Sequence, residues 1–135
     1  MDILAYELLV KGLKDYNETM NKPFGNAVVS TPPSKPTYPL TIVGEIRNVS
    51  NARYNTCYDR VASVGYSIRI YATNKGKFEK IKIAREIAKM VDTYLSSIGL
   101  NRTSYNVVDS LNDDALSEIV MTYTGNLHEN RRNFI

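Results

Sequence analysis

Residues 79–99, EKIKIAREIAKMVDTYLSSIG, are the stretch that decides the fold. Apolar residues recur there in steps of three and four, which places them on one face of a helix. These residues are Ile81, Ala84, Ile87, Ala88, Val91, Leu95 and Ile98. The pattern ends at Gly99, a residue suited to the left-handed backbone conformation that terminates helices. The spacing therefore predicts one amphipathic helix over residues 79–98.

Extended patterns precede and follow this helix. Residues 64–73 give the clearest alternation of apolar and polar side chains, which is typical of a strand with one buried face. Residues 40–48 alternate in the same way, with Leu40, Ile42, Gly44 and Ile46 on one side. Weaker signals predict strands at 27–30 and 102–109. A long final strand covers 116–127, and one of its sides carries Ile119, Met121, Tyr123, Gly125 and Leu127.

A second helix is predicted at the N-terminus, over residues 3–20. Its expected buried stripe is Leu4, Leu8, Leu9, Leu13, Tyr16 and Met20. Gly12 should weaken this helix by ~1 kcal/mol relative to alanine. Two helices with one apolar stripe each, beside strands with one apolar face, predict an α+β two-layer sandwich. The order is α-(β)-β-β-α-β-β, with a mainly antiparallel sheet packed by two helices.

Composition places the chain among globular proteins. Its 135 residues, 43% hydrophobic and 23% charged, suit one domain over 1–135 that buries roughly two thirds of its unfolded surface. No apolar run approaches the ~20 residues needed to span a bilayer, so we expect no membrane partner. The N-terminus starts with Asp2 and an amphipathic pattern, so we expect no signal peptide. The single Cys57 leaves no internal disulfide and favours a reducing compartment. A net charge of +3 is too small to indicate a nucleic-acid binder.

Residues 26–39 form a proline-rich arm or loop. Four prolines within 31–39 remove backbone donors and favour extended, polyproline-like geometry. Two interpretations remain open. The segment is either a solvated connector or a stiff arm laid across a neighbouring subunit, since preset backbone angles reduce the entropy lost on docking. The C-terminal tail, 129–135, is expected to hang free unless a partner orders it.

Reactive chemistry has few candidates in this sequence. Cys57 and His128 could form a nucleophile–base pair, but nothing in their spacing brings them together, and a passive cysteine and a surface histidine are the favoured interpretation. One Cys and one His cannot supply the four ligands of a zinc site. The acidic cluster could hold Mg²⁺, although Asn-Asp-Asp is also ordinary turn chemistry. This cluster is Asp109, Asp113, Asp114 and Glu118.

A basic run surrounds the start of the central helix. It consists of Lys75, Lys77, Lys80, Lys82, Arg85 and Lys89. Such a run could face nucleic acid, but Glu79 and Glu86 interleave at spacings suited to helical ion pairs, which favours a solvated helix face. The residues alone therefore predict a non-enzymatic domain without cofactor, catalytic residue or metal, whose output is contact with other proteins.

Four pieces of sequence, in order, carry a family resemblance. They are YPLTIVGEI (38–46) with the Asn-rich stretch to Asn55, VGYSIRIYA (64–72), AREIA (84–88) with Val91-Asp92, and GLNRTS (99–104) with the turn LNDD (111–114) and the strand TYTG (122–125). Over 39–129 the chain resembles the tail terminator, or tail completion, proteins of phages that infect Gram-positive hosts and of phage-tail-like bacteriocins. Thr122 stands where a charged residue would be expected on the last strand.

The resemblance implies a structural virion protein that assembles in the host bacterial cytoplasm. Six copies would form a hexameric ring on the head-proximal end of the tail tube, stop tube polymerisation and present a surface for head attachment. The implied partners are other copies of the chain, the tail tube protein, a neck or head-completion protein and, in a contractile tail, the sheath protein. DNA would only pass through the lumen.

A closed ring needs two different patches on each subunit. The proline segment and the polar loop over 48–60 are the expected donors of one patch, and an edge strand of the other. The predicted interface residues are Pro32, Pro33, Lys35, Pro36, Tyr38, Arg47, Asn51, Arg53, Tyr54, Tyr58, Arg131 and Arg132. Two alternatives stay open. One is another neck or head–tail connector ring, and the other is a small basic nucleic-acid-binding α/β domain, for which salt-dependent DNA retention would be diagnostic.

Overall fold

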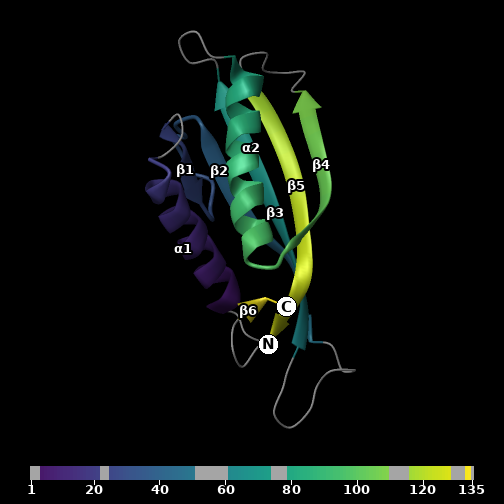
Figure 1. The fold of residues 1–135 in the computed structure, drawn as a ribbon. Coiled ribbons are helices and arrows are strands. Elements are labelled where there is room, and N and C mark those ends of the chain that lie inside the picture. Colours follow the sequence, from purple (N-terminus) through teal and green to yellow (C-terminus); the bar gives the residue numbers. More distant parts are fainter. Residues whose placement is uncertain are drawn as a thin grey trace.

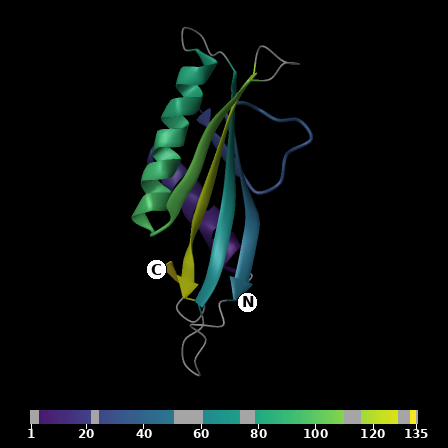
Figure 2. The same ribbon diagram turned by 90° about the vertical axis from the view of Figure 1, so that its right-hand side faces the viewer.

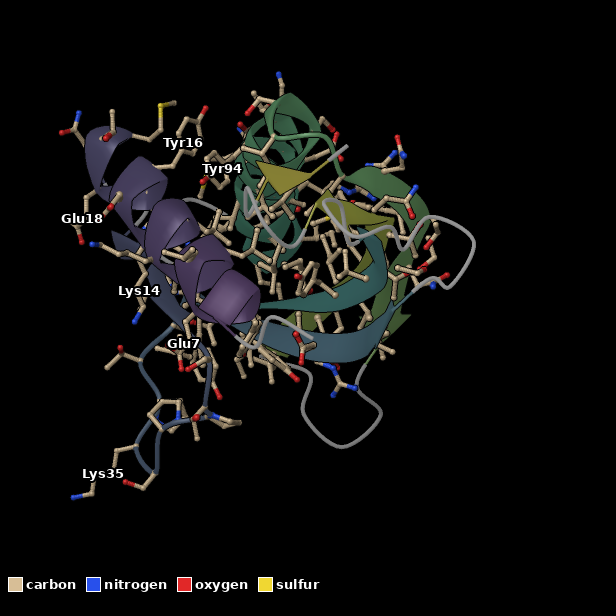
Figure 3. All side chains as sticks on the ribbon, turned by 90° about the horizontal axis from the view of Figure 1, so that it is seen from below. Glu7, Lys14, Tyr16, Glu18, Lys35 and Tyr94 are labelled. Atoms are coloured by element: carbon tan, nitrogen blue, oxygen red, sulfur yellow. The ribbon has the colours of Figure 1, made fainter. Side chains whose placement is uncertain are left out.

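The computed structural model describes residues 4–21, 25–50, 61–73, 79–109, 116–128 and 133–134. Within them the elements are α1 (Leu4–Thr19), β1 (Ala27–Val29), β2 (Leu40–Ser50), β3 (Val61–Thr73), α2 (Lys80–Ser97), β4 (Asn101–Asp109), β5 (Leu116–His128) and β6 (Asn133–Phe134). The strands form one sheet, and both helices lie on the same side of it (Figures 1 and 3). The protein is an α+β two-layer sandwich, as the sequence predicts.

The sheet is mainly antiparallel. Its strand order is β1-β2-β3-β5-β4, and β6 pairs with the end of β5. The β1–β2 pair is parallel, whereas β2–β3, β3–β5, β4–β5 and β5–β6 are antiparallel. The tail that was expected to hang free thus contributes Asn133 and Phe134 to the sheet, opposite His128 and Leu127.

Helix α2 matches the predicted span closely. Glu79 is its N-cap, and its C-terminus has the two reverse hydrogen bonds of a Schellman motif: Leu100 N–H donates to Leu95 O (3.1 Å) and Gly99 N–H to Ser96 O (3.2 Å). Gly99 has φ 100°, so the predicted left-handed terminator is confirmed. The predicted ends of the stripe, Ile81 and Ile98, are only partly buried. The buried residues are Ile83, Ala84, Ile87, Ala88, Met90, Val91 and Leu95.

Strand β3 supplies the centre of the core. Its helix-facing side chains are Val64, Tyr66, Ile68, Ile70 and Ala72, all fully buried. Full burial of an isoleucine side chain stabilises the fold by about 1.5–3 kcal/mol. The partner strand β5 places Ile119, Met121 and Tyr123 on the same side, also fully buried, as the sequence predicts.

Strand β2 is oriented differently from the simplest interpretation of its sequence. Thr41 and Val43 face the helices and are fully buried, while Ile46 lies 60% exposed. The cause is register: Thr41 is opposite Ile70 and Val43 is opposite Ile68, and antiparallel partners share a face of the sheet. A β-bulge between Glu45 and Arg47 then shifts the alternation.

Helix α1 buries only part of the predicted stripe. Leu9 and Leu13 are buried as predicted, but Leu8 and Met20 are each 48% exposed, and Val10 and Asn17 are buried as well. The helix is turned so that Asn17 reaches Asn26, the residue before β1, and its side-chain amide donates to the Asn26 carbonyl (3.0 Å). A polar contact between buried groups therefore sets the rotation of this helix.

Gly12 lies where the two helices cross. The rings of Tyr16 on α1 and Tyr94 on α2 stack at 5.1 Å, as Figure 3 shows. A Cβ atom at position 12 would overlap the Tyr94 hydroxyl and come within 3.3 Å of its Cζ. The glycine that weakens α1 locally is thus required by the packing of Tyr94.

Replacing Gly12 with alanine should therefore destabilise the protein by about 1–3 kcal/mol, because overpacking outweighs the gain in helix propensity. Denaturant unfolding measures the change. In a Tyr94→Phe background, which removes the overlapping hydroxyl, the same substitution should cost clearly less. Equal costs in both backgrounds would show that Tyr94 is not the obstacle.

Candidate interaction surfaces

The loop between β1 and β2 projects from the face of the sheet opposite the helices. Figure 2 shows it standing out on the side away from α2, and Figure 3 places Lys35 at its far tip. Residues 30–37 are all exposed, whereas Tyr38 is half-buried and Pro39 is buried. The Tyr38–Pro39 peptide bond is cis. The loop therefore presents prolines and one lysine to solvent from an anchored base.

An apolar pocket lies between this loop and the sheet. Its volume is about 200 Å³, and it is lined by Pro32, Pro33, Pro36, Tyr38, Leu40, Ile42 and Tyr71. Burial raises the pKa of the Tyr71 hydroxyl, which has Arg69 and Glu118 as charged neighbours. Because Tyr71 is opposite both Leu40 and Glu118, the pocket is bordered by a polar cluster on the same face.

Predicted interface residues from the proline segment thus come together here, namely Pro32, Pro33, Pro36 and Tyr38. Lys35 is at the loop tip, outside the pocket lining. Arg47 lies in β2 opposite Gly65, far along the strand from Leu40. The remaining predicted residues fall outside the described part of the chain; they are Asn51, Arg53, Tyr54, Tyr58, Arg131 and Arg132.

The face of the sheet opposite the helices is covered by small polar residues at its centre. Gly44, Ser67, Thr122 and Ser104 follow one another across β2, β3, β5 and β4. A Cβ atom on Gly44 would come within 2.8 Å of the Ser67 hydroxyl. Thr122 contacts the hydroxyls of both Ser104 and Thr103. This part of the face consequently carries small side chains, three of which have hydroxyl groups.

A buried polar cluster joins α1, the start of β1 and β2. The Asn26 side-chain amide donates to Asn17 Oδ1 (3.3 Å), and Thr41 Oγ1 donates to Asn26 Oδ1 (3.1 Å). All three residues are buried. Each polar atom finds its partner within the cluster, so these residues act as a clip between helix and sheet.

A second polar cluster joins α2 to β5 and β4. The buried Tyr123 hydroxyl donates to Asp92 Oδ1 (2.7 Å), and the Arg102 guanidinium lies 3.8 Å from the same oxygen. Arg102 also lies over the Tyr105 ring, 5.4 Å from its centroid. Burial raises the pKa of Tyr123, and the neighbouring Asp92 carboxylate raises it further. The hydroxyl is therefore a proton donor at all physiological pH values.

The catalytic and metal candidates are not assembled in the described structure. Cys57, Asp113 and Asp114 lie outside the described residues. His128 ends β5 opposite Val61, and Glu118 lies opposite Tyr71. Among the described ranges, no group of three or more His, Cys, Asp or Glu residues could hold a metal ion.

The basic run is only partly described. Lys82, Arg85 and Lys89 are exposed on α2 together with Glu86, while Lys75 and Lys77 lie outside the described residues. This arrangement fits the solvated helix face favoured by the sequence. In the described part of the chain, neither helix is long and apolar enough to cross a membrane.

Comparison with models of known protein families gives no match. Comparison with curated proteins gives no significant match either.

Sequence reasoning missed both polar clusters. Asn17 stands four residues after Leu13, in line with the buried stripe, and that position was the available signal for a buried polar contact. Thr41 and Asp92 gave no comparable signal, because their roles depend on partners far away in the sequence: Asn26 lies 15 residues from Thr41, and Tyr123 lies 31 residues from Asp92.

Removing the Asn26 side chain should destabilise the protein strongly. Asn26→Ala leaves the buried Asn17 and Thr41 side chains without this partner, at a cost of about 3 kcal/mol. Thr93→Ala is the matched control, because its hydroxyl bonds Lys89 O at an exposed site, and it should change stability by less than about 0.5 kcal/mol. Similar losses in both variants, measured by denaturant unfolding, would contradict the role of the clip.

Tyr123 should make stability depend on alkaline pH. Its pKa is higher in the folded than in the unfolded chain, so its stabilising contribution is complete below about pH 10 and is lost as the pH rises through the folded pKa. Above pH 10, Tyr123→Phe should therefore reduce the downward slope of unfolding free energy by up to about 1.4 kcal/mol per pH unit. An unchanged slope would mean that Tyr123 ionises equally in both states.

Proposed function

We propose that the protein is a structural tail terminator: a hexameric ring that occupies the head-proximal end of a tail tube, stops its growth and provides the surface for head attachment. The observation that carries the proposal is the ordered set of four sequence pieces that resemble this family. The ring acts by occupying space and by offering a shaped surface, so it requires no reactive group.

The fold supports the proposal because the described parts of the resembling pieces fall on neighbouring strands of one sheet and on the helix that packs on them, while the turn 111–114 lies outside the described residues. Residues 38–46 enter β2, 64–72 lie in β3, 84–88 lie in α2, and 99–104 with 122–125 lie in β4 and β5. These strands are contiguous in the sheet, and α2 packs on their helix-facing side. The sheet flanked by helices that the resemblance implies is the architecture of this chain.

The surfaces of the sandwich are also suited to a ring that contacts several partners. Its two layers are unlike, with helices on one side and the open sheet face with its proline loop on the other (Figure 2). A head-to-tail ring uses different patches of each subunit and leaves further surface for other proteins. We assign the proline loop and its pocket to contacts between subunits or with the tube end.

Electrostatics adds a constraint on the ring. Six copies at +3 each would carry roughly +18, and a lumen that held this charge would retain DNA phosphates. The excess positive charge should therefore lie on the outside or on the axial faces of the ring.

Deleting the gene and imaging the particles by electron microscopy tests the function. The expected result is headless tails of uncontrolled length, restored to normal by a wild-type copy of the gene. Tails of normal length joined to heads would contradict the proposal. Tails of normal length without heads would instead support the alternative, a neck or head–tail connector ring that binds the capsid side but not the tube.

A further inference from the structure

Strand β4 is an edge strand of the described sheet, and its middle lacks the usual protection of such strands. Natural edges are kept from pairing with other chains by charges, prolines, shortness or a covering element. Residues 103–108 of β4, TSYNVV, contain no charge and no proline. Helix α2 lies over β3 and β5 and leaves β4 at the side of the sandwich (Figure 1). Tyr105 (39%) and Val107 (42%), on the helix-facing side of β4, are consequently exposed, and Val108 (38%) is exposed on the opposite face.

A second free edge lies on the opposite side of the sheet, interrupted by the β-bulge between Glu45 and Arg47. β1 pairs with β2 only along Leu40–Ile42, so residues 44–50 of β2 have no strand beside them on that side in the described structure. The Pro39 carbonyl accepts from Ala27 N–H, and strand alternation turns the Val43 carbonyl to the same side, where the Tyr6 hydroxyl donates to it. The free edge therefore begins after Val43, and it carries Ile46, 60% exposed.

The two edges match in direction and length. β2, β3, β5 and β4 alternate in direction, so β4 runs antiparallel to β2. Rotation about an axis along the strands preserves strand direction, so β4 of one copy would meet β2 of the next as an antiparallel pair. The regular part of β4 after its bulge, 104–109, extends about 20 Å, and the free edge of β2, 44–50, has a similar span that includes its bulge between Glu45 and Arg47.

We propose that β4 of one copy pairs with the free edge of β2 in a second copy, so that one sheet continues from subunit to subunit with all helices on the same side. This inference rests on the proposed ring and names its subunit interface. The pairing joins two different edges, so it is the head-to-tail kind that closes a ring. It also covers the exposed apolar residues on both edges.

Three lysine substitutions at exposed positions test the interface by sedimentation velocity and native mass spectrometry. Val107→Lys on β4 and Ile46→Lys on β2 should each weaken association by at least about tenfold, because a charge at the edge opposes strand pairing. Leu8→Lys is the matched control on α1, 48% exposed in the wild type, and it should associate normally. Normal association of both edge variants would overturn the proposal, as would a wild-type protein that stays monomeric at millimolar concentration.

Mixing the two edge variants gives the sharpest outcome. Each retains the edge that the other has lost, so a 1:1 mixture should form heterodimers through one intact interface but no rings. A mixture that remains monomeric, or one that forms full rings, would overturn the pairing.

Hydrogen exchange of the wild-type protein supplies a measurement that does not depend on any variant folding. Amides within 104–108 should exchange more slowly in the assembled than in the dilute protein, and unchanged exchange would contradict the interface. The two proposals can fail separately. If the edge lysines disrupt the rings but deletion of the gene leaves tails normal, the interface is supported and the tail function is rejected. If deletion gives overlong tails but both edge variants still form rings, the tail function is supported and the interface is rejected.

Discussion

The rest of the structure depends on the rule that paired strands share a face, applied to the central strand β3. Its helix-facing side chains from Val64 to Ala72 are fully buried, and β3 pairs with β2 on one side and β5 on the other. Once the buried face of β3 is known, the register of each neighbouring strand determines which of its side chains face the helices. Thr41 is buried for this reason although it is polar, and Ile42 is turned to the open face although it is apolar.

This rule explains what could be predicted from the sequence and what could not. The long periodic segments, α2, β3 and β5, were predicted closely because each has a strong internal signal that agrees with its burial. β2 has apolar residues at both alternating positions, so its own sequence does not say which side is buried. Its register with β3, which is a long-range property, decides the matter.

The interface predictions also depend on whether the signal is local or long-range. The proline loop could be located from local chemistry, since four prolines within nine residues exclude a helix or an inner strand. The pocket beside the loop could not be predicted from local chemistry, because one of its walls is Tyr71, which is more than thirty residues away in the sequence. The exposure of Val107 could not be predicted from the sequence either. Its strand has ordinary β propensity, and only the position of α2 over β3 and β5 leaves it uncovered.

The two helices are held to the sheet by polar contacts at opposite places, Asn17–Asn26–Thr41 under α1 and Tyr123–Asp92 under α2. Apolar burial is non-directional, whereas these hydrogen bonds fix where each helix lies. They place α1 beside β1 and the start of β2, and α2 over β5, with Asp92 of α2 also reaching Arg102 of β4. The same contacts that define the sandwich therefore also leave its two edges and its second face open. Within the described ranges, the outer side of β4 and residues 44–50 of β2 therefore have no strand beside them.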